Sequence, residues 1–172
     1  MIARLTITSA SPKGVIVATP SLADLLKAWR EAERRWERQA SATDVRAAAL
    51  VVVQAWAAYQ DAALPHDTDE FMLVADDGGA YVAATRGVHR VLGYEPAALV
   101  GRRIADVAAP AMVEQTPQDW TRFLAEGRQE GTFLLSAANG GVVALRYQAR
   151  AHHPVPGFHV SRLWPAERMS SG

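Results

Sequence analysis

One stretch of the sequence decides the fold: VHRVLGYEPAALVGRRIADV, from Val88 to Val107. Its apolar residues come in short runs, and Gly93 and Gly101 separate these runs at intervals too short for a long helix. Because glycine is favoured where helices end, the pattern predicts three helices of one or two turns. A series of short helices can curve around a cavity, whereas one long helix would lie flat on a sheet.

Two short strands are predicted before this stretch. Residues 70–75 (EFMLVA) and 80–84 (AYVAA) are apolar, and Asp76-Asp77-Gly78-Gly79 between them is typical of a tight turn. A helix is predicted after the stretch, from Thr116 to about Glu126. Its start has Thr at the N-cap and Pro117 at the first helical position, which both favour helix initiation.

Three more strands are predicted at the end of the chain, over residues 132–136, 142–149 and 157–164. In the middle one, Val143, Leu145 and Tyr147 alternate with more polar residues, which is typical of a half-buried antiparallel strand. Because the helices separate the first two strands from the last three, all five must share one antiparallel sheet. We therefore expect an α+β fold with helices over one face and a cavity between the two layers.

The N-terminal part has a different character. Residues 2–7 and 14–18 look like a short β-hairpin. Ser21 then precedes a long amphipathic helix, whose apolar residues recur every three or four positions. A second helix is predicted from about Val45 to Ala63, and it is apolar almost all round, so it must be buried on more than one side.

Two interpretations of this helical pair are open. The helices can pack on each other and on the following domain, or their surplus apolar surface can form a homodimer interface. The candidates for that interface are Leu22, Leu25, Trp29, Trp36, Val52 and Trp56. A polar, proline-containing linker at residues 64–69 ends the pair.

Composition excludes several classes of function. The 172 residues include 18 basic and 18 acidic side chains, so no overall field attracts nucleic acid. Cysteine is absent, which rules out disulfides, thiolate catalysis and cysteine-ligated metals. The longest apolar run, AAALVVVQAWAA, is shorter than the roughly 20 residues of a membrane span, and MIARLTITS lacks an export signal. We expect a cytoplasmic protein that binds neither nucleic acid nor membrane.

The order of elements resembles the PAS domain. The stretch RGVHRVLGYEPAALVGRRIADV is similar to the family's commonest motif, at Leu92-Gly93-Tyr94, Leu99, Gly101, Ile104 and Val107. NGGVVALRYQARA and PGFHVSRL resemble its last two strands. The resemblance covers about residues 69–164. It predicts four parts: a possible β-hairpin at 1–19, a helical cap at 20–64, a PAS-like domain at 69–165 and a tail at 166–172.

The resemblance implies a sensory or protein-interaction module, with an N-terminal helical cap that dimerises. Residues 163–167 (LWPAE) replace the D-[IV]-T connector of many PAS domains, and the chain carries no kinase, cyclase or DNA-binding domain. We therefore expect a stand-alone, non-enzymatic module that signals through a homodimer and an unidentified downstream protein.

Candidate residues for a ligand pocket lie on the helix before the third strand, on the strands and on the short helices. They are Ile104, Met112, Trp120, Phe123, Leu135, Leu145, Tyr147, His159 and Ser161. Among them His159 alternates with Ser161 and Leu163 on the last strand, and if that face points at the cavity, His159 is a polar group in an apolar pocket and needs a hydrogen-bond partner. A structural histidine and a ligand-contacting one are both consistent with that position. Neither a catalytic group nor a metal site is expected, because the adjacent His152 and His153 point apart.

Three functions are open. The cavity can hold a small-molecule ligand whose binding rearranges the dimer. It can instead hold haem or flavin for gas or redox sensing, although the sequence requires no cofactor and residues 111–127 contain no histidine as a haem ligand. Alternatively, large side chains fill the pocket and the protein is a ligand-free dimerisation platform.

Overall fold

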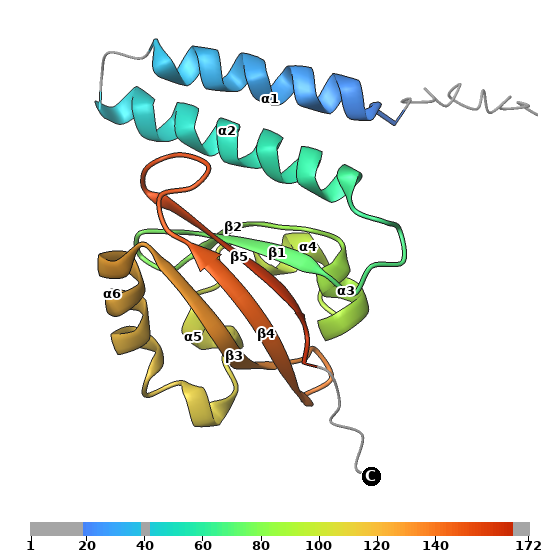
Figure 1. Ribbon diagram of the computed structural model, residues 1–172, viewed down its shortest axis with the longest axis vertical. Helices are drawn as coiled ribbons and strands as arrows, with labels where there is room; N and C mark the ends of the chain where they lie inside the picture. The colour runs from blue at the N-terminus through green and yellow to red at the C-terminus, as the bar shows by residue number, and fades with distance from the viewer. Residues whose placement is uncertain (1–18, 39–41, 167–172) are drawn as a thin grey trace, which may run out of the picture.

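The computed structural model describes residues 19–38 and 42–166. The β-hairpin expected within residues 2–18 lies outside these ranges. None of the described helices is both long enough and apolar enough to cross a membrane. The described chain consists of two long N-terminal helices, a five-stranded sheet and a group of short helices between its strands (Figure 1).

Strands and helices follow the predicted order. The helices are α1 (Leu22–Glu37), α2 (Ala42–Ala63), α3 (Gly87–Leu92), α4 (Pro96–Leu99), α5 (Ile104–Val107), the 3-10 helix η1 (Pro110–Met112) and α6 (Thr116–Glu126). The strands are β1 (Phe71–Asp76), β2 (Tyr81–Ala84), β3 (Arg128–Ser136), β4 (Val142–Arg150) and β5 (Phe158–Pro165).

The sheet has the strand order β2-β1-β5-β4-β3, and every neighbouring pair is antiparallel. The last strand therefore lies in the centre and joins the first hairpin to the β3–β4 hairpin. This confirms the α+β fold with one five-stranded antiparallel sheet. β3 begins at Arg128, four residues earlier than predicted, because it pairs with β4 as far as Arg150.

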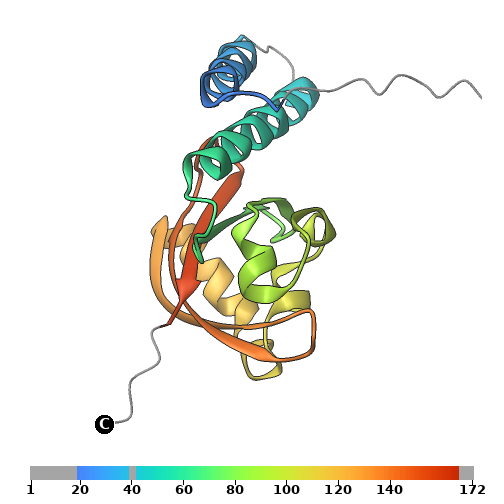
Figure 2. The same ribbon diagram turned by 90° about the vertical axis from the view of Figure 1, so that its right-hand side faces the viewer.

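One face of the sheet, called the inner face here, is covered by α3, α4, α5 and α6 (Figure 2). The stretch from Val88 to Val107 forms three short helices, as predicted. Leu92, Leu99 and Val107, one from each helix, are buried against the sheet. The same stretch also completes the free edge of β2, since the Gly101 N–H donates to the Tyr81 carbonyl over 2.8 Å. The short helices thus wrap the end of the sheet as well as its inner face.

The opposite, outer face carries the N-terminal helices. α2 lies across β1, β2 and the β4–β5 loop, and α1 packs on α2 on the side away from the sheet (Figures 1 and 2). Val52 and Trp56 are buried in a core shared with Met72 and Val160. The packing interpretation of the helical pair is therefore realised within one chain. Because Val52 and Trp56 contact the sheet, this arrangement leaves them unavailable as dimer contacts.

A β-bulge in the first hairpin determines which side chains reach the inner face. Ala75 pairs with Tyr81 and Val74 pairs with Ala83, so Val82 is an extra residue without a partner. The bulge reverses the alternation of side chains along β2. As a result Tyr81 joins the inner core, whereas Ala83 packs in the outer core with α2.

Candidate functional site

A cavity of about 90 Å³ lies between α6 and the inner face of the sheet. Its walls are mostly apolar, with side chains such as Leu73, Phe133 and Leu163 from the sheet and Phe123 from α6. The roof of the cavity is formed by α6 and by Ile104 of α5, which is the residue that the glycine-interrupted stretch contributes to the lining.

Seven of the nine predicted pocket residues line this cavity. They are Ile104, Trp120, Phe123, Leu135, Tyr147, His159 and Ser161. The other two do not: Leu145 is fully buried in the inner core, and Met112 is half-buried in η1. A role in ligand binding stays a prediction for all seven.

Four polar residues of the cavity wall are absent from the predicted set. They are Tyr81, Thr116, Asp119 and Gln129. Thr116 and Asp119 belong to the first turn of α6, and their position on the cavity side follows from the helical spacing to Trp120 and Phe123. Tyr81 could not be assigned to the inner face, because simple alternation along β2 places it with Ala83 and the sequence does not mark the bulge.

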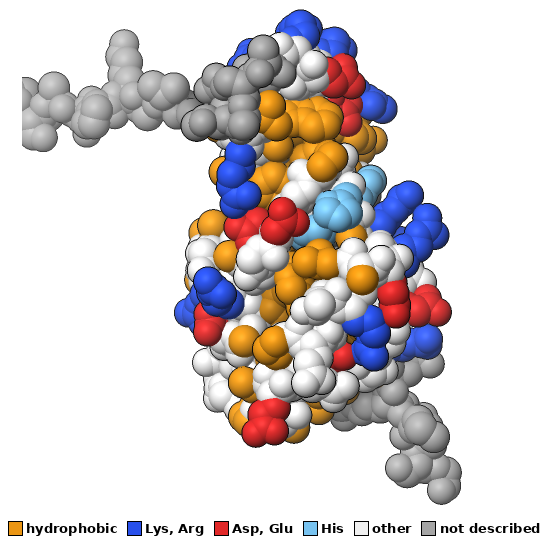
Figure 3. All heavy atoms as spheres, turned by 90° about the vertical axis from the view of Figure 1, so that its left-hand side faces the viewer, with side chains coloured by type: hydrophobic (Ala, Val, Ile, Leu, Met, Phe, Trp, Pro, Cys, Tyr) orange, Lys and Arg blue, Asp and Glu red, His pale blue; other side chains and the backbone are white. Residues whose placement is uncertain are grey.

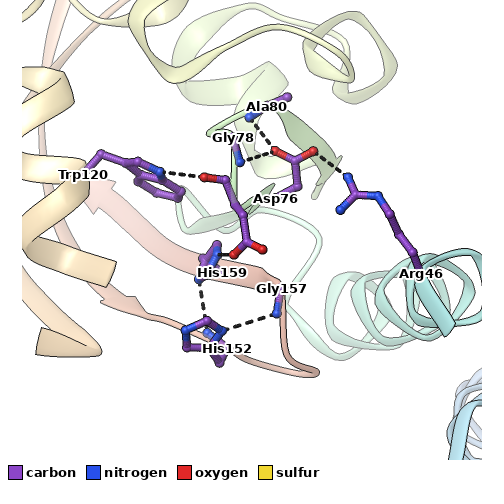
Figure 4. A network of polar contacts seen from close by, with 9 residues as sticks. Arg46, Asp76, Gly78, Ala80, Trp120, His152, Gly157 and His159 are labelled. Carbon is purple, nitrogen blue, oxygen red and sulfur yellow. Dashed lines mark hydrogen bonds and ion pairs between the residues drawn. The ribbon is translucent and has the colours of Figure 1, made fainter. Parts of the chain in front are cut away.

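His159 is the centre of a hydrogen-bond network at the cavity wall (Figure 4). Its ring is almost completely buried, with 1% of the side chain exposed, and Trp120 and Phe123 contact it edge-on. Nε2 lies 2.8 Å from Asp77 Oδ1, and the backbone N–H of His152 donates to Nδ1 over 3.1 Å.

These two contacts define the protonation state of His159. Because Nδ1 accepts a hydrogen bond, the ring proton of the neutral imidazole is on Nε2, which donates it to Asp77. Burial lowers the pKa of His159, and the hydrogen bond to Asp77 offsets part of that effect. His159 is therefore a neutral residue with both nitrogens occupied, and the structural interpretation of this histidine is the one that its contacts favour.

The β1–β2 turn connects this network to the N-terminal helices. Asp77 also accepts, through its backbone carbonyl, a hydrogen bond from Trp120 Nε1 on α6. The preceding residue, Asp76, accepts from the N–H groups of Gly78 and Ala80 and forms a 3.0 Å ion pair with Arg46 on α2. Two successive residues of one turn thus contact the cavity wall and the N-terminal helical pair (Figure 4).

Comparison with solved structures identifies the architecture. The structure superposes on the PAS domain of an HTR-like protein from Haloarcula marismortui with a TM-score of 0.54, covering 66% of this chain and 94% of that one at 14% identity. The fold is that of a PAS domain. A PAS domain from Colwellia psychrerythraea gives a TM-score of 0.52 at 12% identity, with 58% of this chain and 87% of the other covered.

A third PAS domain, from the quorum-sensing receptor RpfR of Cronobacter turicensis in complex with BDSF, gives a TM-score of 0.50 at 12% identity. It covers 59% of this chain and 98% of that one. No family model matches the sequence, and no curated protein matches it either. The likeness to PAS domains is therefore one of three-dimensional structure.

The PAS cavity does not fit haem or flavin in this arrangement. Its volume of about 90 Å³ is well below the roughly 300–1,000 Å³ that pockets for drug-sized ligands need. His159, the histidine of the cavity wall, would have to give up a hydrogen bond to ligate an iron. Binding of either cofactor would require the helices to move away from the sheet.

Within the described ranges, one group of side chains has a geometry that could hold a metal ion. It consists of Asp77, His152 and His159, whose ligand atoms lie within 4.8 Å of one another. The hydrogen bonds of the two histidine rings oppose metal binding. His152 Nδ1 accepts from the Gly157 N–H over 3.3 Å, as His159 Nδ1 does from His152. Both ring protons are therefore on Nε2, so ligation through Nε2 would break both hydrogen bonds.

The predicted divergence of the two adjacent histidines is seen in their contacts. The His152 ring packs on His159 with 5.0 Å between ring centroids, whereas the His153 ring packs edge-on against Trp56 of α2. Burial, together with Arg150, lowers the pKa of His153. In the space-filling view, histidine side chains gather between the N-terminal helices and the PAS domain, beside acidic ones (Figure 3).

Proposed function

We propose that this PAS domain is a sensory module that binds a small molecule in the cavity between α6 and the sheet. The observation that carries the proposal is the cavity itself, which combines apolar walls with hydrogen-bonding side chains such as Tyr81, Gln129 and Ser161. Pockets that bind small molecules have this composition, with a few polar groups to orient a ligand among apolar ones.

The contacts of the β1–β2 turn support a route from the cavity to the N-terminal helices. A ligand that displaces Trp120 or His159 changes the contacts of Asp77, and Asp76 beside it is paired with Arg46 of α2. The protein would then be in equilibrium between one arrangement with these contacts and one without them. The ligand can shift that equilibrium only by the difference in its affinity for the two arrangements. Signalling then requires that α2 adopts two positions on the outer face.

The structural relatives add support of a limited kind. The PAS domain of RpfR is seen in complex with BDSF, so this fold can hold a small molecule. At 12% identity the identity of the ligand does not transfer to this chain.

The test is to identify what the protein carries when it is purified natively. Native mass spectrometry should find a small-molecule adduct that denaturation releases. Ala75 is buried and lines the cavity, so Ala75→Leu would fill part of that space and remove the adduct. Ala97→Leu, on an exposed position of α4, is the matched control and should keep it. An adduct that survives Ala75→Leu, or a protein without adduct that binds nothing from a cell extract, contradicts the proposal.

A homodimer through the N-terminal helices is the second part of the proposal. After α2 has packed on the sheet, Leu22 and Val51 are still 45% and 50% exposed. Val51 belongs to a face of α2 with Ala47, Gln54 and Ala58, all exposed, on which another helix can pack closely. A second copy on this face would connect the movement of α2 to the output of the dimer.

The small cavity volume also favours a second candidate function, a dimerisation platform that binds no ligand.

A further inference from the structure

Tyr81 has a side chain that lines the cavity, and the residue is only 5% exposed. Burial raises the pKa of Tyr81, and no hydrogen bond from a described residue contributes to that shift. Tyrosine hydroxyls in such positions normally have a hydrogen-bond partner. The Tyr81 hydroxyl is not one of the fully enclosed, unpaired polar atoms of the described residues, so a group inside the cavity can reach it and supply that partner.

Three other polar side chains of the cavity wall are committed. The Thr116 hydroxyl donates to the Met112 carbonyl over 2.7 Å, Trp120 Nε1 donates to the Asp77 carbonyl, and His159 uses both ring nitrogens. The remaining uncharged polar side chains, those of Gln129, Tyr147 and Ser161, are only half-buried. Tyr81 is therefore the most deeply buried of the uncommitted groups that can orient a ligand.

The charges of the cavity wall favour an uncharged ligand. None of the described lysines and arginines lines the cavity, and His159 is neutral there. Asp119, the carboxylate that the described residues contribute to the wall, is already paired with Arg122 over 2.5 Å. An anionic ligand would lie unpaired beside that carboxylate, and burying an unpaired charge is strongly unfavourable.

The volume limits the size of the ligand. An apolar cavity of about 150 Å³ admits benzene, and this one has about 90 Å³. In proportion, a molecule of about four non-hydrogen atoms is the upper limit without movement of α6. Larger molecules would need Trp120 or the helix to shift.

We propose that the cavity takes a small, uncharged, mainly apolar molecule whose oxygen, such as that of a carbonyl group, accepts a hydrogen bond from Tyr81. This inference rests on the proposed function, since it names the ligand class of the same cavity. It assigns the orienting role to Tyr81, whereas the sequence pointed to His159.

The test uses two probes of four non-hydrogen atoms each, acetone and 2-methylpropene, in which a carbonyl oxygen is exchanged for a CH₂ group. Titrations of the full chain would be followed by the NMR shifts of backbone amides around the cavity and of the Trp120 indole N–H. Tyr81→Phe removes only the hydroxyl. A hydrogen bond of about 1–1.5 kcal/mol corresponds to about tenfold in affinity, so the ratio of acetone to 2-methylpropene affinity should fall about tenfold in this variant. Tyr59→Phe, on α2 and outside the cavity, should leave the ratio unchanged.

The outcomes separate the two proposals. If both probes bind and Tyr81→Phe leaves their affinity ratio unchanged, the ligand class is wrong although the cavity binds small molecules. Tighter binding to the wild type of acetate, an anion of four non-hydrogen atoms, than of acetone also overturns it. If neither probe shifts the cavity resonances of the wild type, both this inference and the proposed function fail.

Discussion

The backbone N–H of His152 donates to Nδ1 of His159, and this hydrogen bond places the ring proton of His159 on the nitrogen that faces Asp77. A loop residue thereby determines the tautomer of a buried residue in the central strand of the sheet. The arrangement has consequences for stability that can be measured without knowledge of the ligand.

Asp77→Ala removes the acceptor of the His159 Nε2–H and leaves a buried donor unpaired. We expect the free energy of unfolding to fall by about 1–3 kcal/mol, the usual cost of an unsatisfied buried polar group. Urea denaturation at pH 7.5 measures it. Asp67→Ala, at an exposed linker position, is the control. Equal effects of the two substitutions would show that the Asp77–His159 contact does not stabilise the fold.

The stability should also decrease as the pH falls below about 6.5, the ordinary pKa of histidine. The pKa of His159 is lowered in the folded protein by burial, so the unfolded chain binds a proton first. The contribution of His159 is therefore fully present above pH 6.5 and is lost as the pH falls through its folded pKa.

Urea denaturation of the wild type and of His159→Gln between pH 7.5 and pH 5 tests this. The variant should be less stable at neutral pH and should lose less stability on acidification. Part of the slope should persist, because the pKa of His153 is lowered by burial and by Arg150. Parallel slopes for the two proteins would refute the assignment to His159.

Gly87→Ala should be among the most destabilising substitutions in the chain. A Cβ atom at this position would overlap the backbone carbonyl oxygen of Glu70, so α3 would have to move away from β1. We expect a loss of about 2–3 kcal/mol, typical of overpacking. In Gly131→Ala the nearest contact of the new Cβ would be 3.5 Å, to Tyr147, and the change should be within about 0.5 kcal/mol. A thermal unfolding series of the two variants and the wild type compares them, and similar losses would contradict this packing of α3.

The proposed dimer predicts that Val51→Arg produces a monomer. A charged side chain on the exposed face of α2 would be buried without a partner in the interface. Light scattering after size-exclusion chromatography, at micromolar concentrations, distinguishes the two states. Val100→Arg is a matched control, since Val100 is 52% exposed but lies on the far side of the sheet from α2. A wild-type protein that is monomeric at these concentrations removes the dimer from the proposal.

The architecture could be predicted from the sequence because the residues that mark turns and helix ends agreed with the order of strands and helices. Gly93 and Gly101 ended helices where the pattern predicted, and the Asp76–Gly79 turn joined two strands. The antiparallel sheet followed from the order of elements alone. The extension of β3 to Arg128 was missed, since its first residues alternate poorly and are held by pairing with β4.

The candidate site was less predictable, because it depends on distant contacts. No local pattern places Asp77 beside His159, which is 82 positions further along the chain. The surplus apolar surface of α2 was recognised, but the sequence could not decide whether a sheet or a second copy covers Val52 and Trp56. The inward position of Tyr81 depends on a bulge without a sequence signal.

That bulge has an evolutionary consequence. With Val82 as the additional residue, Tyr81 and Ala83 face opposite sides of the sheet. In a homologue that keeps this residue but lacks the bulge, Val82 would pair with Ala75 and face the cavity, and the tyrosine would be directed toward the N-terminal helices. Ligand preference among such homologues then diverges through a shift of strand register, even where every cavity-lining residue of the other strands is identical.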